Sequence, residues 1–260
     1  MAQSVWRVDG DWAELCLPTA SARFDWRRPA MGLTGLQADG RAVAGDGLLQ
    51  VELADVTEPN AAAVECYERG GDLVVTYGEL PSRPLRAQLY LRSGSHALAG
   101  ASAAIELVAS VQTSLLDSNS QLAVRSRLAA AAVWRLTAAG PSSSADVAWQ
   151  RVALQPGQSW AIDGQSGAGS FLLRLPGEFS YAEFVHPLDF HQTTLTMQDP
   201  PGGSGWPQVQ LRHELFARRL EKGVILRARV LGVLLPRAGD LAAALEHYQA
   251  FAASEPPLTT

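Results

Sequence analysis

Side chains alternate between apolar and polar through nearly the whole chain, with a period of two. In segment 84–92, for example, Ala87, Leu89 and Leu91 fall on one face and mostly polar residues on the other. This period is typical of strands that bury one face, because successive side chains point to opposite sides of a strand. The pattern predicts strands at 12–17, 48–56, 64–68, 73–77, 84–92, 105–112, 121–128, 132–137, 147–154, 171–175, 181–185, 193–197 and 209–216. Glycine-containing turn pairs separate many of them, so we expect antiparallel pairing.

Two segments near the C-terminus depart from this pattern. Segment 224–235 is apolar on both faces, which predicts a central strand that is covered on both sides. After it, Leu241, Leu245 and Tyr248 recur at helical spacing and predict a helix at about 240–253 that packs on the sheet. We therefore expect an all-β fold, a large antiparallel β-sandwich with one C-terminal α-helix. Since strands continue across the serine-rich stretch 138–145, we interpret it as a loop and expect one domain, 1–260.

Composition and charge exclude several classes of protein. The 260 residues are 47% hydrophobic and 18% charged, too apolar for a disordered chain. The formal net charge is -5 without a basic stripe, so we expect no nucleic-acid partner. Apolar runs are far shorter than the roughly 18–20 residues that cross a bilayer, so we expect no membrane partner. Residues 1–12 lack the apolar core of a secretion signal, which favours a cytoplasmic protein.

Titratable side chains concentrate between residues 181 and 214. This stretch includes the carboxylates and histidines of Glu183, His186, Asp189, His191, His213 and Glu214. A histidine paired with Glu183 or Glu214 suits proton transfer near neutral pH, because the ordinary imidazole pKa lies close to it. We therefore assign Glu183, His186 and Glu214 as candidate catalytic residues. Asp189, His191 and His213 are candidate ligand-binding residues.

The same side chains admit two other interpretations. His186, Asp189, His191 and His213 are residue types that bind zinc or iron, although their spacing is looser than that of known zinc motifs. We expect no cofactor but keep a metal site as an alternative. In the third interpretation, His186 and Asp189 only stabilise a corner of the chain by hydrogen bonds, and His213 faces solvent.

Two further features indicate ligand binding. A loop rich in glycine and proline carries Trp206, and it is either a lid over a cleft or a surface excursion. Exposed tryptophans stack against sugar rings, although core packing is the alternative for each one. Arg227 and Arg229 share a strand face, where guanidinium groups bind hydroxyls or carboxylates unless acidic neighbours occupy them. Trp206 and Arg227 are therefore added to the candidate ligand-binding residues.

Three segments resemble the galactose mutarotase-like β-supersandwich, the fold of aldose epimerases and of domains in several polysaccharide-active enzymes. The opening, with LCLP at 15–18, ARF at 22–24 and GLTGL at 32–36, is similar to the first hairpin of that family and its turn. LQPGQSW at 154–160 resembles the turn into a late strand, and the tail 220–237 resembles the closing strands of bacterial members. The resemblance implies this scaffold and a sugar ligand. The family's Asn-x-x-Asn-His-x-Tyr-Phe segment is absent, so its histidine and glutamate roles are open only to His186 or His213 with Glu183 or Glu214.

We therefore carry three hypotheses. The first is a carbohydrate-binding or sugar-modifying protein with a cleft where Trp134, Trp149 or Trp206 lies beside corner 183–191. The second is a non-catalytic assembly module, a possible homodimer through a sheet face, whose corner is already saturated by internal hydrogen bonds. The third is a metal-dependent enzyme acting on a small molecule, which requires metal bound through at least His186 and His191.

Overall fold

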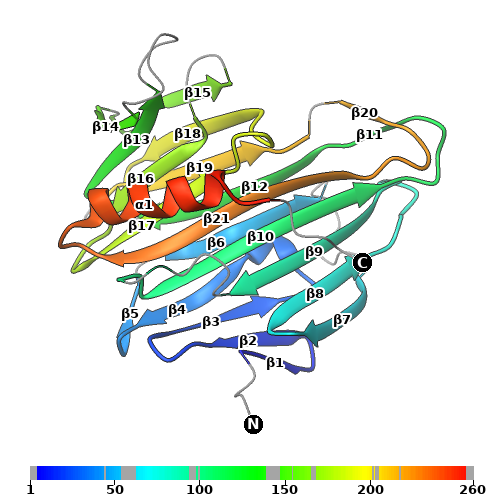
Figure 1. Cartoon of the computed structure of the whole chain (residues 1–260), viewed down its shortest axis with the longest axis horizontal. Coiled ribbons are helices and arrows are strands. Elements are labelled where there is room, and N and C mark those ends of the chain that lie inside the picture. The colour runs from blue at the N-terminus through cyan, green and yellow to red at the C-terminus, as the bar shows by residue number, and fades with distance from the viewer. Residues whose placement is uncertain are drawn as a thin grey trace.

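The structure is a computed structural model of the chain. It describes residues 5–43, 45–53, 63–93, 98, 100–138, 147–153, 155–164, 168–200, 202, 205–216 and 218–255. Most of the 138–145 stretch, and positions 201, 203 and 204 of the loop before Trp206, lie outside the described residues. The described strands form two large antiparallel sheets and one small one, followed by a single C-terminal α-helix (Figure 1). The expected antiparallel β-sandwich with a C-terminal helix is confirmed.

The first large sheet has ten strands in the described part of the chain. Its order is β1 (Trp6–Asp9), β2 (Trp12–Cys16), β3 (Ala20–Asp25), β4 (Leu33–Ala38), β6 (Gly45–Leu53), β12 (Leu122–Ala129), β19 (Gln208–Glu214), β18 (Gln192–Gln198) and β15 (Ser159–Asp163), with β5 (Arg41–Ala42) paired to β4. A short 3-10 helix, η1 (Pro29–Met31), precedes β4. Neighbouring strands are antiparallel, so polar and apolar faces stay in register across the sheet.

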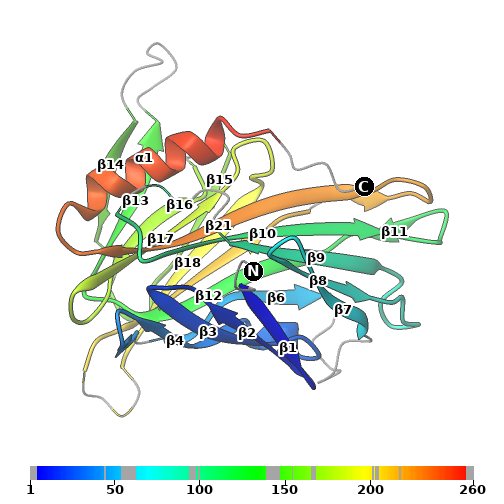
Figure 2. The ribbon, with the colours of Figure 1, turned by 60° about the horizontal axis from the view of Figure 1, so that its bottom comes forward.

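The second large sheet has nine strands among the described residues. Its order is β14 (Val147–Val152), β13 (Ala132–Ala138), β16 (Ser170–Arg174), β17 (Phe179–Val185), β21 (Leu226–Pro236), β10 (Ala103–Gln112), β9 (Arg86–Ser93), β8 (Asp72–Tyr77) and β7 (Ala63–Arg69). A two-stranded sheet, β11 (Ser118–Asn119) with β20 (Arg219–Leu220), projects at one end of the molecule (Figure 2).

The main hydrophobic core lies between the two large sheets. Strand β12 shows how alternation builds it: Val124 and Leu128 are buried in this core, whereas Arg125 and Arg127 point to the opposite, outer face. The outer face of the ten-stranded sheet is therefore polar along this strand.

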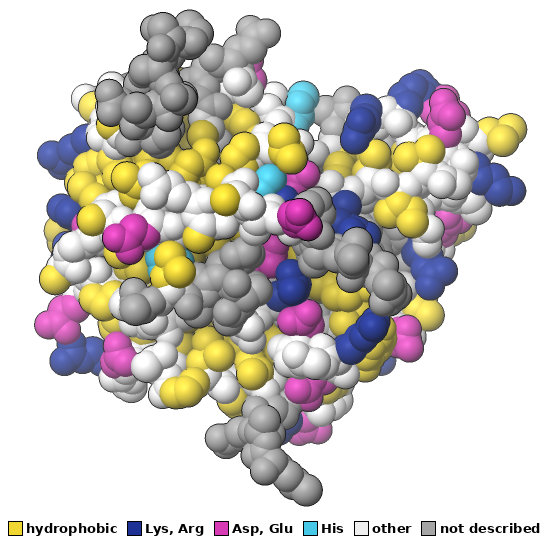
Figure 3. Space-filling view, viewed as in Figure 1, with side chains coloured by type: hydrophobic (Ala, Val, Ile, Leu, Met, Phe, Trp, Pro, Cys, Tyr) yellow, Lys and Arg dark blue, Asp and Glu magenta, His cyan; other side chains and the backbone are white. Residues whose placement is uncertain are grey.

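Strand β21 is covered on both sides, as its sequence predicts. Val230 and Leu234 face the main core, and Leu231, Val233 and Leu235 face a second core. Helix α1 (Asp240–Ala252) closes this second core, and hydrophobic side chains gather around α1 on that side of the molecule (Figures 1 and 3). The predicted helix at about 240–253 is confirmed.

A charged clamp holds the start of α1 against the sheet. Gly239 takes the position before the helix with a left-handed backbone, and Asp240 is the first helical residue. Its carboxylate accepts hydrogen bonds of 2.8 and 2.9 Å from Arg174 and one of 2.7 Å from Ser180. Within the described residues, no helix is both long and apolar enough to cross a membrane.

Candidate functional site

Glu183 lies on the inner face of β17, between the two large sheets. Its Oε1 is 2.8 Å from Nε2 of His213 on β19, and its Oε2 accepts hydrogen bonds of 2.5 Å from Ser126 and Tyr181. On the other side of the imidazole, the Thr193 hydroxyl lies 2.7 Å from Nδ1 of His213. Glu183 and His213 are both 0% exposed. The five side chains form one closed polar network in the core.

This network links the two sheets. Glu183 and Tyr181 belong to the nine-stranded sheet, and Ser126, Thr193 and His213 belong to the ten-stranded sheet. A buried carboxylate needs hydrogen-bond partners because it has lost its water, and these neighbours supply them. His213 therefore does not face solvent, and Glu183 does not line an open hollow. The structure brings these two predicted residues together, and their catalytic or binding roles stay predictions.

His186 and Asp189 lie in the corner after β17, packed against the end of α1. The buried His186 ring meets the ring of Phe251 edge-on, with 5.3 Å between centroids, and its Nδ1 is 4.0 Å from Oδ2 of Asp189. The same Oδ2 accepts a hydrogen bond of 3.1 Å from the backbone N–H of Arg229, whose guanidinium reaches Ser254. Burial lowers the pKa of His186 and raises that of Asp189. Asp189 and Arg229 thus bond within the corner, whereas the buried Nε2 of His186 has no hydrogen-bond partner among the described residues, so the corner is not saturated as the assembly hypothesis expects.

Three other predicted site residues, His191, Trp206 and Arg227, lie outside the buried polar network. His191 is exposed at the end of the same corner, and Trp206 is 51% exposed before β19. Arg227 lies on the outer face of the nine-stranded sheet, with Nε 3.3 Å from the Ser110 hydroxyl. The described chain contains no group of three or more histidine, cysteine, aspartate or glutamate side chains that could hold a metal ion.

Two of the tryptophans expected beside the corner lie elsewhere. Trp134 stacks with Arg174 at 4.4 Å, and Trp149 donates a hydrogen bond of 2.9 Å to the carbonyl of Leu241. Leu241 lies at the start of α1, whereas the corner contacts Phe251 at its end. These two rings support the helix instead of lining a cleft at residues 183–191.

Glu214 belongs to a different surface, the outer face of the ten-stranded sheet. Alternation and antiparallel register place a group of polar side chains there on three neighbouring strands, β6, β12 and β19. We call this group the polar ladder; its members are Gln50, Glu52, Arg125, Arg127, Gln210, Arg212 and Glu214.

Ion pairs and hydrogen bonds join the ladder across strands. Glu52 lies between two guanidiniums, 2.9 Å from Nη1 of Arg125 and 2.9 Å from Nε of Arg212. Arg212 also contacts Oε1 of Glu214 at 2.7 Å, and Arg125 donates to Gln50 at 2.6 Å. Burial opposes the charge of Arg212, but the two glutamates outweigh it and raise the pKa of Arg212. The glutamate side chains are 14% and 38% exposed at positions 52 and 214, so they are partly buried by their neighbours.

A bulge in β6 positions one end of the ladder. Leu49 has a backbone φ of 51°, which residues other than glycine rarely adopt. Its backbone N–H donates a hydrogen bond of 2.9 Å to the Ser126 hydroxyl. Gln50 follows it and packs against Gly32 and Gly47, where an added Cβ would lie within 2.8 and 2.4 Å of the Gln50 side chain. Bulges of this kind re-aim side chains beside functional sites.

Sequence reasoning identified Glu214 but missed its partners Gln50, Glu52 and Arg212. The signal that was present is the alternation in QVQLRHE at 208–214, which places Gln210, Arg212 and Glu214 on one face. The pairing of β19 with β12 and of β12 with β6 joins segments far apart in the chain, and strand periodicity carries no information about it.

No family model matches the sequence, and no curated protein matches it. Solved structures do. An Escherichia coli protein proposed to be an aldose 1-epimerase aligns with 89% of this chain and 98% of its own, with a TM-score of 0.54 and 9% identity. A Salmonella typhimurium protein proposed to be a mutarotase aligns over 89% and 93%, with a TM-score of 0.56 and 9% identity. The chain has a galactose mutarotase-like fold.

The mutarotase-like fold also occurs within larger enzymes. A GH36 α-galactosidase from Geobacillus stearothermophilus aligns with 96% of this chain but only 44% of its own, with a TM-score of 0.53 and 11% identity. At such identities the likeness concerns the backbone arrangement. The two large sheets of this chain are thus a mutarotase-like scaffold, and the polar ladder lies on the outer face of one of them.

Proposed function

We propose that the chain binds a carbohydrate on the polar ladder. The observation that carries the proposal is the set of guanidinium, carboxylate and amide groups held at fixed positions across β6, β12 and β19. Such groups suit sugar hydroxyls, because each guanidinium or carboxylate offers several donors or acceptors in one plane. The mutarotase-like scaffold, found in proteins whose names refer to aldoses and galactosides, supports the same ligand class.

The contacts within the ladder favour binding in a second way. Arg212 is held by Glu52 and Glu214, and Arg125 is held by Glu52 and Gln50. Side chains that are already ordered lose little conformational entropy when a ligand arrives. If the bound sugar also reacts, we propose Glu214 as the base, because it is the more exposed of the two carboxylates.

The test is isothermal titration calorimetry of the whole chain with glucose, galactose and an α-galactoside, which measures the affinity for each sugar. We expect at least one of them to bind and Arg212→Gln to weaken that binding by about tenfold, because it removes charge-assisted hydrogen bonds. The matched control is Arg23→Gln, which changes an exposed arginine of β3 in the same sheet. Absence of binding in the unmodified chain, or equal affinity in Arg212→Gln, contradicts the proposal.

The remaining assignments stay predictions. These are the ligand-binding roles of Asp189, His191, His213, Trp206 and Arg227, and the catalytic roles of Glu183 and His186. A homodimer formed through a sheet face also stays a prediction.

A further inference from the structure

Arg127 differs from the other two arginines of the polar ladder in its partners. Arg125 and Arg212 each lie 2.9 Å from Glu52. Arg127 has no carboxylate partner in the part of the chain that the structure describes, and its Nη2 donates a hydrogen bond of 3.1 Å to Oε1 of Gln210. The three arginines and two glutamates of the ladder therefore leave one positive charge in excess, and it lies at Arg127.

The guanidinium of Arg127 is held in place and still has donors for a ligand. Its Nε is buried and has no hydrogen-bond acceptor among the described residues, so neighbouring atoms enclose the side chain at that point. A guanidinium carries five N–H donors, and the bond to Gln210 uses one donor on Nη2. The remaining donors of the two Nη atoms suit an acceptor from outside the chain. A negatively charged acceptor would form the stronger, charge-assisted hydrogen bonds with them.

The neighbours of Arg127 on the adjacent strands are neutral. On the β6 side Arg127 is opposite Gly47, and the Gln50 amide lies where a Cβ of that glycine would point. On the β19 side Arg127 is opposite Gln210. Neither neighbour brings a negative charge, so these side chains would not repel an anion bound at Arg127.

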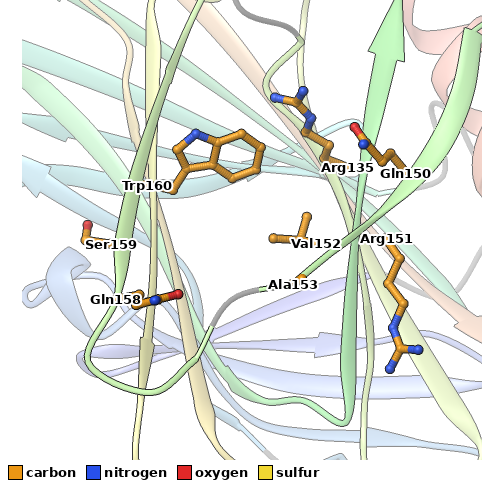
Figure 4. A pocket seen from close by; sticks show the side chains of 8 residues that line it. All are labelled: Arg135, Gln150, Arg151, Val152, Ala153, Gln158, Ser159 and Trp160. Atoms are coloured by element: carbon orange, nitrogen blue, oxygen red, sulfur yellow. The ribbon is translucent and has the colours of Figure 1, made fainter.

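A row of uncharged polar side chains continues from Arg127 across β19, β18 and β15. Gln210 is opposite Thr196, and Thr196 is opposite Ser159. Opposite residues share a face of the sheet, and the hydroxyls of Thr196 and Ser159 lie 3.2 Å apart. Figure 4 shows Ser159 on the side of β15 away from the ring of Trp160, which packs against the main core. Hydroxyl and amide groups both donate and accept hydrogen bonds, which suits sugar hydroxyls.

We propose that the ladder selects a sugar that carries a carboxylate, with the carboxylate on Arg127 and the hydroxyls on the row that ends at Ser159. This inference rests on the proposed carbohydrate binding at the ladder and adds the class of sugar. A hexuronate such as glucuronate combines these groups. One carboxylate matches the single excess positive charge, whereas a phosphate dianion would bring a second negative charge near Glu52 and Glu214. The formal net charge of the chain is -5, so general attraction of anions does not account for such a preference.

The test is isothermal titration calorimetry of the whole chain with glucuronate, its neutral amide glucuronamide, and glucose. Glucuronate and glucuronamide have nearly the same shape and differ in charge. We expect glucuronate to bind about tenfold more tightly than glucuronamide, because its charge strengthens the hydrogen bonds to Arg127. Arg127→Gln should lower this ratio of affinities to nearly one. The matched control, Arg23→Gln, removes the same charge from β3 of the same sheet and should keep the ratio of the unmodified chain.

An NMR titration of the ¹⁵N-labelled unmodified chain locates the site without a substitution. Glucuronate should shift the Nε–H signal of Arg127 and the side-chain amide signals of Gln210, and glucuronamide should shift them less. This measurement decides the location even if Arg127→Gln does not fold.

The proposal is wrong if the unmodified chain binds glucuronate and glucuronamide equally, or if Arg127→Gln leaves the ratio unchanged. It is also wrong if Arg23→Gln lowers the ratio as much, if the shifts fall on other residues, or if glucose 6-phosphate binds more tightly than glucuronate. Glucose separates this inference from the proposed function. If glucose binds and glucuronate has no advantage over glucuronamide, the ladder binds carbohydrate without selecting a carboxylate; if no sugar binds, both proposals are wrong.

Discussion

His186 and His191 belong to the same corner and have opposite surroundings. His186 is 1% exposed and lies between Phe251 and Asp189, whereas His191 is exposed to solvent. Burial favours the neutral imidazole and therefore lowers the pKa of His186, an effect that the nearby charge of Arg229 reinforces and that Asp189 and Glu106 oppose. The corner therefore buries one of its two histidines and leaves the other exposed to solvent.

This difference predicts the pH dependence of stability. The unfolded chain protonates His186 near its ordinary pKa of about 6.5, but the folded chain does so only at lower pH. The stability that neutral His186 contributes is therefore complete above that value and is lost as the pH falls below it. We expect His186→Asn to lose less unfolding free energy between about pH 7 and pH 5 than the unmodified chain, measured by urea denaturation. A profile for His186→Asn that runs parallel to that of the unmodified chain would contradict the assignment.

The sequence predicted which residue types gather near the site but not which of them meet. Glu183 and His213 are both candidates from the sequence, yet their contact across the core depends on β17 and β19 lying in facing sheets. Alternation states on which face of a strand a side chain lies, and it does not state what lies opposite. The ion pairs of Glu52 with Arg125 and Arg212 could not be predicted from alternation either, because they require three particular strands to lie side by side.

At the scale of elements, β21 shows both what patterning can predict and what it cannot. Its two apolar faces predicted a central strand, and it does lie between β17 and β10 under α1. Periodicity does not predict why β21 contains Gly232. Gly232 pairs with Glu183, and a Cβ added to it would lie 2.5 Å from the Tyr181 hydroxyl, which donates to Glu183.

We therefore expect Gly232→Ala to disrupt the polar network between the sheets. The added methyl group displaces the Tyr181 hydroxyl and weakens its bond to Glu183, which should lower the free energy of unfolding by about 1–3 kcal/mol. Urea denaturation measures the loss. Gly164→Ala is the control, because a Cβ there meets nothing within 4 Å, and it should change stability by less than about 1 kcal/mol. Equal stability of the two variants would contradict this expectation, because it would show that the core accommodates the added methyl group without losing unfolding free energy.

At the scale of the whole molecule, the two large sheets have different outer faces. α1 covers apolar residues of β16, β17 and β21 on the nine-stranded sheet, whereas the ten-stranded sheet presents the polar ladder. Phe251 is 0% exposed and anchors the last turn of α1 beside His186. The hydrophobic side chains beneath the helix depend on this cover to stay out of water.

Phe251→Asp should therefore detach the end of α1. A buried aspartate without a partner is costly, and we expect a loss of about 3 kcal/mol of unfolding free energy together with stronger binding of a hydrophobic dye. Gln249→Asp places the same charge on an exposed position of the same helix and should leave both measurements unchanged. If the two variants behave alike, the helix does not depend on Phe251 for its position.

The two described ends of the chain are fixed to different layers of the sandwich. The carbonyl of Val5 accepts a hydrogen bond of 2.8 Å from Cys16 in β2, and the carbonyl of Glu255 accepts one of 3.1 Å from Arg229 in β21. Energy transfer between fluorescent labels attached near these ends would therefore report the distance between the two layers. A change in that transfer would reveal any change in the separation of the two sheets.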